Sequence, residues 1–197
     1  MDSRKILFNI YRKCREKANS GKGIGFGKSS IGKKLIKSTD EMLKPNHCFV
    51  QGHKMFLDKF DSLDLSINQE YGFLETKIIK DEINSGDIVI DLGAHIGYYT
   101  LLFARQSGID GKVFAFEPEP SNFSILKKNI YENNYENIIA VQKAASDSNS
   151  QINLWIGQES SGANRIYKPK QTNTQNFKIS KVNSIKLDDY FMNSEYI

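Results

Sequence analysis

Cysteine is scarce in this sequence of 197 residues, where Cys14 and Cys48 are the only two. Two cysteines are too few for a disulfide framework, and their separation matches no metal-ligand spacing. The sequence therefore predicts a cytoplasmic protein, kept in a reducing compartment and without a structural metal ion.

A long hydrophobic run is also missing. The apolar start, residues 6–11, is interrupted by Asn9 and closed by Arg12 and Lys13. It is shorter than the core of a signal peptide and far shorter than a membrane span. We therefore expect neither a secretory leader nor a transmembrane segment.

Two glycine motifs that bind phosphates are incomplete. A phosphate loop ending at Gly27-Lys28-Ser29 needs a glycine five positions before Gly27, where Lys22 stands. A dinucleotide fingerprint that starts at Gly93 needs glycines at the positions of His95 and Tyr98. The sequence therefore disfavours phosphate-loop and NAD binding, and residues 21–30 are predicted to be a flexible basic linker.

Positive charge is concentrated near the N-terminus. Residues 1–38 hold eleven Lys and Arg against two acidic residues, which leaves the remainder at about −5 although the whole chain is +4. Apolar positions in residues 4–17 recur at helical spacing, which predicts a short basic amphipathic helix. Such a helix can lie on an anionic membrane surface, dock on the domain or stay solvated, and these alternatives stay open. We divide the chain into this helix with its linker, residues 1–46, and one domain, residues 47–197.

A strand, a glycine turn and a helix lie at the centre of the sequence. Residues 88–92 form a mostly β-branched apolar run, as in a strand buried on both faces, and a helix is expected to begin near Ile96. Residues 113–116 and 138–141 predict two further strands, with a helix over 119–131 between them. This alternation predicts an α/β fold, half of a doubly wound sheet with parallel strands.

The flanking segments predict accessory elements. Two β-like runs, 48–57 and 63–67, separated by a polar segment at 58–62, predict a hairpin. Residues 73–83 show a helical stripe. Towards the C-terminus, we expect an exposed strand at 152–156, a polar loop at 157–176 and a last strand at 179–187.

Two acidic residues give the glycine turn its chemical character. Glu117 ends the second strand, where a carboxylate can accept hydrogen bonds from both hydroxyls of a ribose. Asp91 ends the first strand, where its negative charge favours a cation. S-adenosylmethionine has a ribose and a positive sulfonium but no phosphate, so these residues predict it as the cofactor.

The motifs then carry a family resemblance. Residues 86–100 (GDIVIDLGAHIGYYT), 111–123 (GKVFAFEPEPSNF) and 126–129 (LKKN) closely resemble the FkbM family of S-adenosylmethionine-dependent methyltransferases, and the similarity extends over roughly residues 48–191. The resemblance implies a Rossmann-like class I methyltransferase that O-methylates a sugar, a glycan or another small hydroxylated metabolite. It places the methionine end of the cofactor at the glycine turn, the ribose at the end of the second strand and the adenine after the third. The implied cofactor-binding residues are Asp91, Gly93, Ala94, His95, Gly97, Glu117, Pro118 and Ala144.

Two departures from the family qualify this reading. Tyr71 is followed by Gly72 where the family often has glutamate, and the sequence stops at Ile197, before the family's Asp-x-Glu-Gly strand. We therefore expect a sheet that is incomplete at its C-terminal side. The strand at 88–92 would then have an unpaired apolar edge, open to a second copy or to a partner chain. The alternative function is a non-catalytic cofactor-binding or interaction module that a second chain completes.

The sequence identifies no catalytic base. Methyl transfer depends chiefly on holding the acceptor atom in line with the methyl group, and a base adds a modest factor. His95 has a conformational explanation, since histidine tolerates the left-handed region, and Glu75, Asp188 and Asp189 are better explained as helix-surface or capping residues. Nucleic acid is disfavoured as the acceptor, because no aromatic-lined basic groove accompanies the basic N-terminal arm.

Overall fold

The computed structural model describes residues 3–17, 38–39, 42–158, 160–169 and 176–192. The predicted linker at 21–30 lies outside these ranges. The helices are α1 (Ser3–Lys17), α3 (Leu65–Asn68), α4 (Phe73–Glu82), α5 (Tyr98–Ser107), α6 (Pro120–Glu132), the 3-10 turn η3 (Ser161–Ala163) and α7 (Leu187–Met192). The strands are β1 (His47–Val50), β2 (His53–Phe56), β3 (Ile88–Leu92), β4 (Lys112–Phe116), β5 (Ile138–Val141), β6 (Ala144–Ala145), β7 (Gln151–Gly157) and β8 (Phe177–Ile185).

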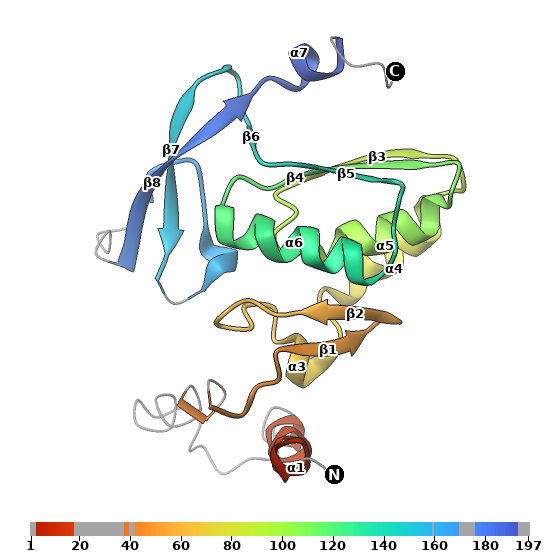
Figure 1. The fold of residues 1–197 in the computed structure, drawn as a ribbon, viewed down its shortest axis with the longest axis vertical. Helices are drawn as coiled ribbons and strands as arrows, with labels where there is room; N and C mark the ends of the chain where they lie inside the picture. Colours follow the sequence, from red (N-terminus) through yellow and green to blue (C-terminus); the bar gives the residue numbers. More distant parts are fainter. Residues whose placement is uncertain (1–2, 18–37, 40–41, 159, 170–175, 193–197) are drawn as a thin grey trace.

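The centre of the molecule is a parallel sheet with the strand order β3-β4-β5. Helix α5 connects β3 to β4, and helix α6 connects β4 to β5. Both helices, together with α4, lie on one face of the sheet (Figure 1). The β-α-β alternation predicted from the sequence is therefore confirmed, and the carboxyl ends of the three strands meet at one edge.

Strand β3 differs from the sequence expectation on one face. Val89 is buried against α5, but Ile88, Ile90 and Leu92, which alternate with it, are 52, 40 and 52% exposed. Their face is the one opposite the helices, because the side chains of a strand alternate between faces. Among the described residues β3 pairs only with β4, so the expected unpaired edge is confirmed and burial on both faces is wrong.

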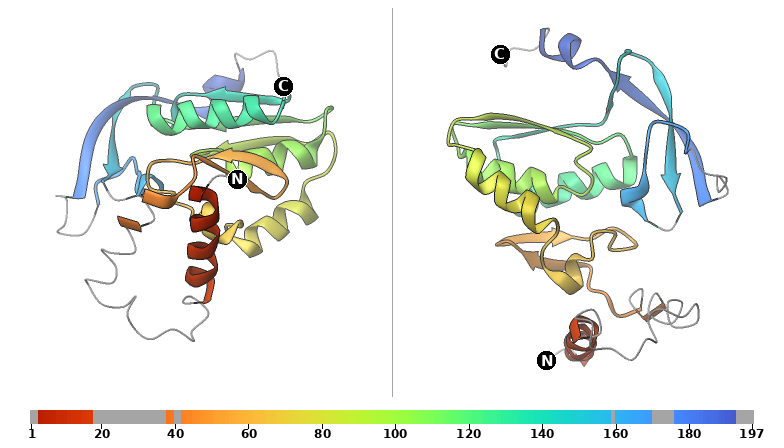
Figure 2. Two further views of the ribbon diagram at one scale, coloured as in Figure 1. Left: turned by 60° about the horizontal axis from the view of Figure 1, so that its bottom comes forward. Right: turned by 180° about the vertical axis from the view of Figure 1, so that it is seen from behind.

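A second sheet, ordered β6-β8-β7, stands beside the first (Figures 1 and 2). Its antiparallel pair β7–β8 confirms the strands expected at 152–156 and 179–187, although the second ends at Ile185 and α7 begins at Leu187. Rings of α7 cover part of the helix-free face of the central sheet, where Phe191 packs edge-on against Phe114 with 4.9 Å between ring centroids. Asp188 and Asp189 lie inside the first turn of α7, where negative charge suits the positive end of the helix dipole, and Asp189 Oδ2 accepts from Asn149 Nδ2 at 2.6 Å.

The predicted hairpin is wrong in its bounds. Both strands of the real hairpin, β1 and β2, come from the first β-like run, and the turn between them is Gln51-Gly52, with φ of 50° and 83°. The second run instead forms α3, where the Asp61 carboxylate accepts hydrogen bonds from the backbone N–H groups of Leu65 and Ser66, each at 3.0 Å. A turn with two positive φ angles and a side-chain cap on a short helix both outweigh the alternating apolar pattern.

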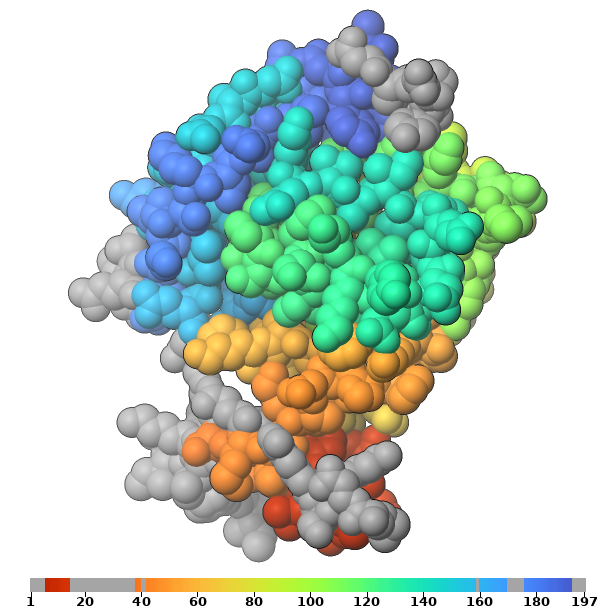
Figure 3. Space-filling view, viewed as in Figure 1, coloured from red at the N-terminus to blue at the C-terminus, as the bar shows by residue number. Residues whose placement is uncertain are grey.

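The hairpin links the N-terminal helix to the rest of the molecule. Figure 3 shows β1 and β2, in orange, between α1 in red and the green helix α6. Phe8 of α1 is buried in a cluster with Leu43 and Ile67, so the predicted helix docks on the domain. Leu7 and Ile10 of α1 stay more than half exposed. No helix within the described residues is long and apolar enough to cross a bilayer.

Asn129 of α6 is a buried polar residue that joins the hairpin, helix α6 and the turn after β3. Its Oδ1 accepts from the Phe56 N–H at 2.6 Å, and its Nδ2 donates to the carbonyls of Phe56 at 3.1 Å and Ile96 at 2.7 Å. The side chain has no exposed surface. Replacing it would leave three backbone groups without partners in a place that water does not reach.

We therefore expect Asn129→Ala to lower the free energy of unfolding by about 3 kcal/mol. Urea unfolding followed by circular dichroism measures the change. Lys127→Ala, two positions earlier on the exposed side of α6, is the matched control and should change stability by less than about 0.5 kcal/mol. Equal stability of the two variants would show that the Asn129 hydrogen bonds do not hold the hairpin.

Candidate cofactor site

The turn after β3 is fixed to the end of β4 by its backbone. The N–H groups of Gly93 and Ala94 both donate to the Phe116 carbonyl, at 2.9 and 3.0 Å. The turn also needs three positive φ angles, 84° at Gly93, 53° at His95 and 94° at Gly97. Glycine adopts such angles without strain and histidine tolerates them, so this sequence can form the turn.

Glu117 is the buried carboxyl group of the site. Its Oε2 accepts from the His95 N–H at 2.8 Å and its Oε1 from the Glu119 N–H at 2.9 Å. The residue is only 4% exposed. Burial raises its pKa to about 7, although the two backbone N–H groups act in the opposite direction. Near neutral pH this carboxyl group therefore changes easily between its neutral and its charged form.

Asp91 supplies a second, partly buried carboxyl group on the other side of the turn. Its Oδ2 accepts from the Thr100 hydroxyl of α5 at 2.5 Å. Burial raises the pKa of Asp91, and the Thr100 hydrogen bond only partly offsets this rise. A positively charged group beside Asp91 would restore its charged form.

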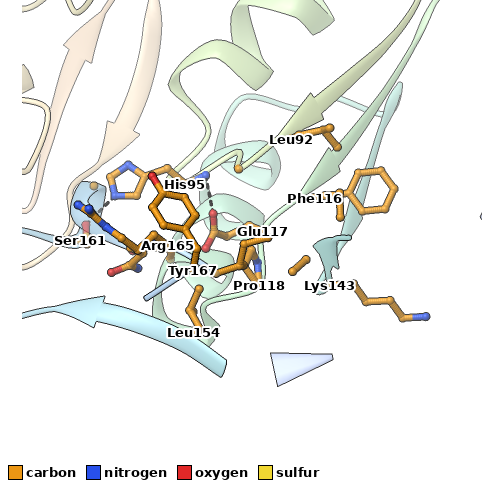
Figure 4. Close-up of a pocket in the computed structure, with 17 residues that line it drawn as sticks. Leu92, His95, Phe116, Glu117, Pro118, Lys143, Leu154, Ser161, Arg165 and Tyr167 are labelled. Atoms are coloured by element: carbon orange, nitrogen blue, oxygen red, sulfur yellow. Dashed lines mark hydrogen bonds between the residues drawn. The ribbon is translucent and has the colours of Figure 1, made fainter. Parts of the chain in front are cut away.

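Two cavities adjoin the turn. The larger, of about 380 Å³, is lined by the end of β4, the start of β6 and the segment that follows β7. Among its lining residues are Glu117, Pro118, Asn122, Ala144, Asn164 and Tyr167. In Figure 4, Arg165 and Tyr167 lie on the same side of this cavity as His95, whereas Leu92 and Phe116 lie on the other.

The smaller cavity, of about 190 Å³, lies on the Asp91 side of the turn and is lined by three tyrosines, Tyr71, Tyr98 and Tyr99. Their rings pack at centroid distances of 5.1 to 6.0 Å. Gly93, His95 and Gly162 line both cavities and so mark the place where they meet. A two-part ligand could therefore occupy both cavities by bending over Gly93.

The predicted site residues come together with one exception. Seven of the eight line one or both cavities: Asp91, Gly93, Ala94, His95, Glu117, Pro118 and Ala144. Gly97 lines neither. A Cβ on Gly97 would lie 2.7 Å from the Leu126 side chain, so this glycine serves the packing of α5 against α6.

Sequence reasoning missed the wall formed by η3. Ser161, Gly162 and Asn164 line the larger cavity, yet they lie in a segment predicted only as a polar loop. The wall is held from far away in the chain, because the Ser161 N–H donates to the Ser62 hydroxyl at 2.9 Å. Nothing in the local sequence signals this contact across 99 positions.

Two observations show that the site fits a polar organic ligand. No atom lies within 4 Å of a Cβ placed on Gly93, so the space next to this backbone is open. Two buried nitrogen atoms, Nδ1 of His95 and Nδ2 of Asn164, have no hydrogen-bond partner within the described structure. Buried polar atoms are normally satisfied, so these two are available to a ligand.

Comparison with known proteins identifies the kind of ligand. The family model of the TRM5/TYW2 methyltransferase domain matches residues 67–189, more than half of the chain. Curated protein sequences give no significant match. The matching model is not that of the FkbM family, so the methyltransferase part of the sequence expectation is confirmed and the FkbM part is not.

Solved structures give weaker likenesses. Trm5b of Pyrococcus abyssi is 20% identical over 49% of this chain and 28% of its own, with a TM-score of 0.38. TYW2 of Pyrococcus horikoshii, in complex with MeSAdo, is 22% identical over 53% of this chain and 38% of its own, with a TM-score of 0.38. Trm5 of Methanocaldococcus jannaschii, in complex with adenosine, is 21% identical over 47% and 27%, with a TM-score of 0.36. The chain spans less than half the length of each.

The family match and the parallel sheet agree on one architecture. The fold is the Rossmann-like class I methyltransferase fold, as the sequence predicted, and its cofactor is S-adenosylmethionine. The chain belongs to the TRM5/TYW2 methyltransferase domain family.

Proposed function

We propose that the chain binds S-adenosylmethionine across both cavities and transfers its methyl group to an oxygen or nitrogen atom of an acceptor. When bound, the cofactor supplies a methyl group already activated by its positive sulfur. Glu117 would accept hydrogen bonds from the ribose hydroxyls, Ala144 and Pro118 would flank the adenine, and Asp91 would face the positively charged methionine end. The protein's own contribution is to hold the acceptor in line and to exclude water.

The observation that carries this proposal is the placement of two carboxyl groups, Glu117 buried and Asp91 partly buried, on opposite sides of one glycine turn. Asp91 lines the smaller cavity and Glu117 the larger, and burial raises the pKa of both. A ligand with a positive charge at one end and hydroxyl groups at the other would compensate both groups at once. S-adenosylmethionine has this arrangement.

The acceptor has two candidates, each with its own support. The FkbM-like motifs support O-methylation of a sugar or another small hydroxylated metabolite. The family match supports a tRNA acceptor, because TRM5 and TYW2 relatives modify tRNA.

Methyl transfer from radiolabelled S-adenosylmethionine separates these candidates. The purified chain is incubated with total tRNA in one reaction and with a panel of nucleotide sugars in another. If the acceptor is a sugar, as the FkbM-like motifs indicate, we expect label in the sugar fraction. If the acceptor is tRNA, as the family match indicates, we expect label in the tRNA reaction that ribonuclease removes. Absence of label from both fractions, with cofactor binding intact, would favour the non-catalytic module.

Glu117→Ala tests the cofactor site directly. Loss of the carboxylate removes both ribose hydrogen bonds, so we expect calorimetry to show S-adenosylhomocysteine binding weakened by roughly a hundredfold. Glu136→Ala, an exposed glutamate on the loop after α6, is the matched control and should bind as the wild type does. Unchanged binding by the Glu117 variant would refute the proposed role of this residue.

The raised pKa of Glu117 predicts a pH dependence of binding. Ribose hydroxyls donate to a carboxylate, so binding favours the charged form, which becomes more abundant as pH rises through about 7. The affinity for S-adenosylhomocysteine should therefore increase by about tenfold from pH 6 to pH 8. Asp91, whose pKa is also raised, acts in the same direction, so Glu117→Gln should make the dependence shallower without abolishing it. An equally steep profile in this variant would contradict the assignment.

A further inference from the structure

A chain of hydrogen bonds runs from the glycine turn to a buried carboxylate outside both cavities. His95 Nε2 lies 2.6 Å from the Ser161 hydroxyl, which lies 3.1 Å from the Ser62 hydroxyl. Ser62 in turn donates to Asp58 Oδ1 at 3.0 Å. This row of hydrogen bonds joins three segments that are distant in sequence, and the bond between His95 and Ser161 is drawn in Figure 4.

The donor and the acceptor of each of these hydrogen bonds follow from the Asp58 carboxylate, where the row ends. The Asp58 carboxylate accepts from the backbone N–H groups of Phe60 and Ser62, and a carboxylate can only accept. Ser62 therefore uses its one hydroxyl hydrogen on Asp58. The Ser161 hydroxyl must then donate to Ser62 and accept from His95. It follows that His95 Nε2 carries the ring hydrogen.

This direction leaves the other ring nitrogen as a base. In a neutral imidazole only one nitrogen carries hydrogen, so His95 Nδ1 has a free lone pair. This atom is buried and has no hydrogen-bond partner within the described structure. Burial lowers the pKa of His95, which keeps the ring neutral, whereas the charges of Asp58 and Glu119 favour the imidazolium. The neutral ring can therefore accept one proton at Nδ1, and the charges of Asp58 and Glu119 then stabilise the imidazolium that forms.

The position of His95 brings this base close to the expected place of the methyl group. His95, Gly93 and Gly162 line both cavities and mark their junction. If the two halves of S-adenosylmethionine occupy the two cavities, its sulfur lies at this junction. The methyl group is then close to the His95 ring, an argument that rests on the proposed function.

We propose that His95 is the general base of the methyl transfer, with Ser161, Ser62 and Asp58 as the positioning residues that fix its tautomer. The acceptor atom forms its new bond to the methyl carbon while the carbon–sulfur bond breaks and its electron pair stays on sulfur. The proton that the acceptor atom loses passes to His95 Nδ1. The resulting imidazolium keeps its Nε2 hydrogen bond to Ser161.

The tautomer can be measured without any activity assay. The chain holds only three histidines, so ¹⁵N NMR of the ligand-free protein resolves their ring nitrogens, and His95→Asn assigns the signal. We expect a protonated Nε2 and a bare Nδ1 in the wild type. Ser62→Ala removes the acceptor for Ser161, so its hydroxyl can turn towards His95 and the two tautomers should mix. An Nδ1–H tautomer in the wild type, or no change in Ser62→Ala, would overturn the proposal.

The role of His95 as the base is tested by comparing two bound ligands by NMR and by measuring kcat in variants. In sinefungin an amine-bearing carbon replaces the methylated sulfur, so exchanging S-adenosylhomocysteine for sinefungin should shift the His95 Nδ1 signal more than the Nε2 signal. With the acceptor pool that takes up label, His95→Asn should lower kcat roughly a hundredfold and Ser62→Ala about tenfold. Asparagine suits the left-handed backbone at this position.

Binding of S-adenosylhomocysteine by the wild type separates failure of this proposal from failure of the proposed function. Ser62 lines neither cavity, but its hydroxyl also accepts from the Ser161 N–H of the cavity wall, so the kcat of Ser62→Ala is measured at saturating cofactor. Loss of binding by the wild type itself would refute the cofactor site. Normal binding with an unshifted Nδ1 signal, or with an undiminished kcat in His95→Asn, would refute only the base.

Discussion

The Glu117 carboxylate holds together the part of the molecule in which both cavities form. Its two oxygen atoms accept backbone N–H groups from the turn after β3 and from the start of α6. Neighbouring bonds extend this connection, since the Phe116 carbonyl receives the N–H groups of Gly93 and Ala94. Without this carboxylate, the turn after β3 and the segment after β4 would lose a shared acceptor inside a buried region.

The same region shows how far the sequence could predict the fold. Between residues 88 and 141 the apolar runs are short, the glycines separate strand from helix, and each element packs against its neighbour in sequence. Local patterns were sufficient there, and the strands and helices were predicted within a few residues. Seven of eight candidate site residues lie at the cavities for the same reason, because the carboxyl ends of parallel strands meet at one edge.

The failures have two physical origins, local backbone geometry that the apolar pattern does not show and a contact between distant segments. The hairpin and α3 were misassigned because their bounds depend on positive φ angles at Gln51 and Gly52 and on the Asp61 side-chain cap. The η3 wall could not be foreseen, because Ser161 is held by Ser62. Gly97 shows the opposite case: it belongs to the motif, but its missing Cβ makes room for Leu126 rather than for a ligand.

The electrostatics of the site explain why one class of nucleoside cofactor suits it better than another. A dinucleotide would bring its pyrophosphate to the glycine turn, between the carboxyl groups of Asp91 and Glu117, where no glycines replace His95 and Tyr98. Negative charge placed there would be repelled by both groups and would raise their pKa values further. A sulfonium with a ribose has the reverse effect. These two carboxyl groups would therefore disfavour nucleotide phosphates as well as bind the cofactor, so the selectivity of the site follows from the same loss of solvent that raises their pKa values.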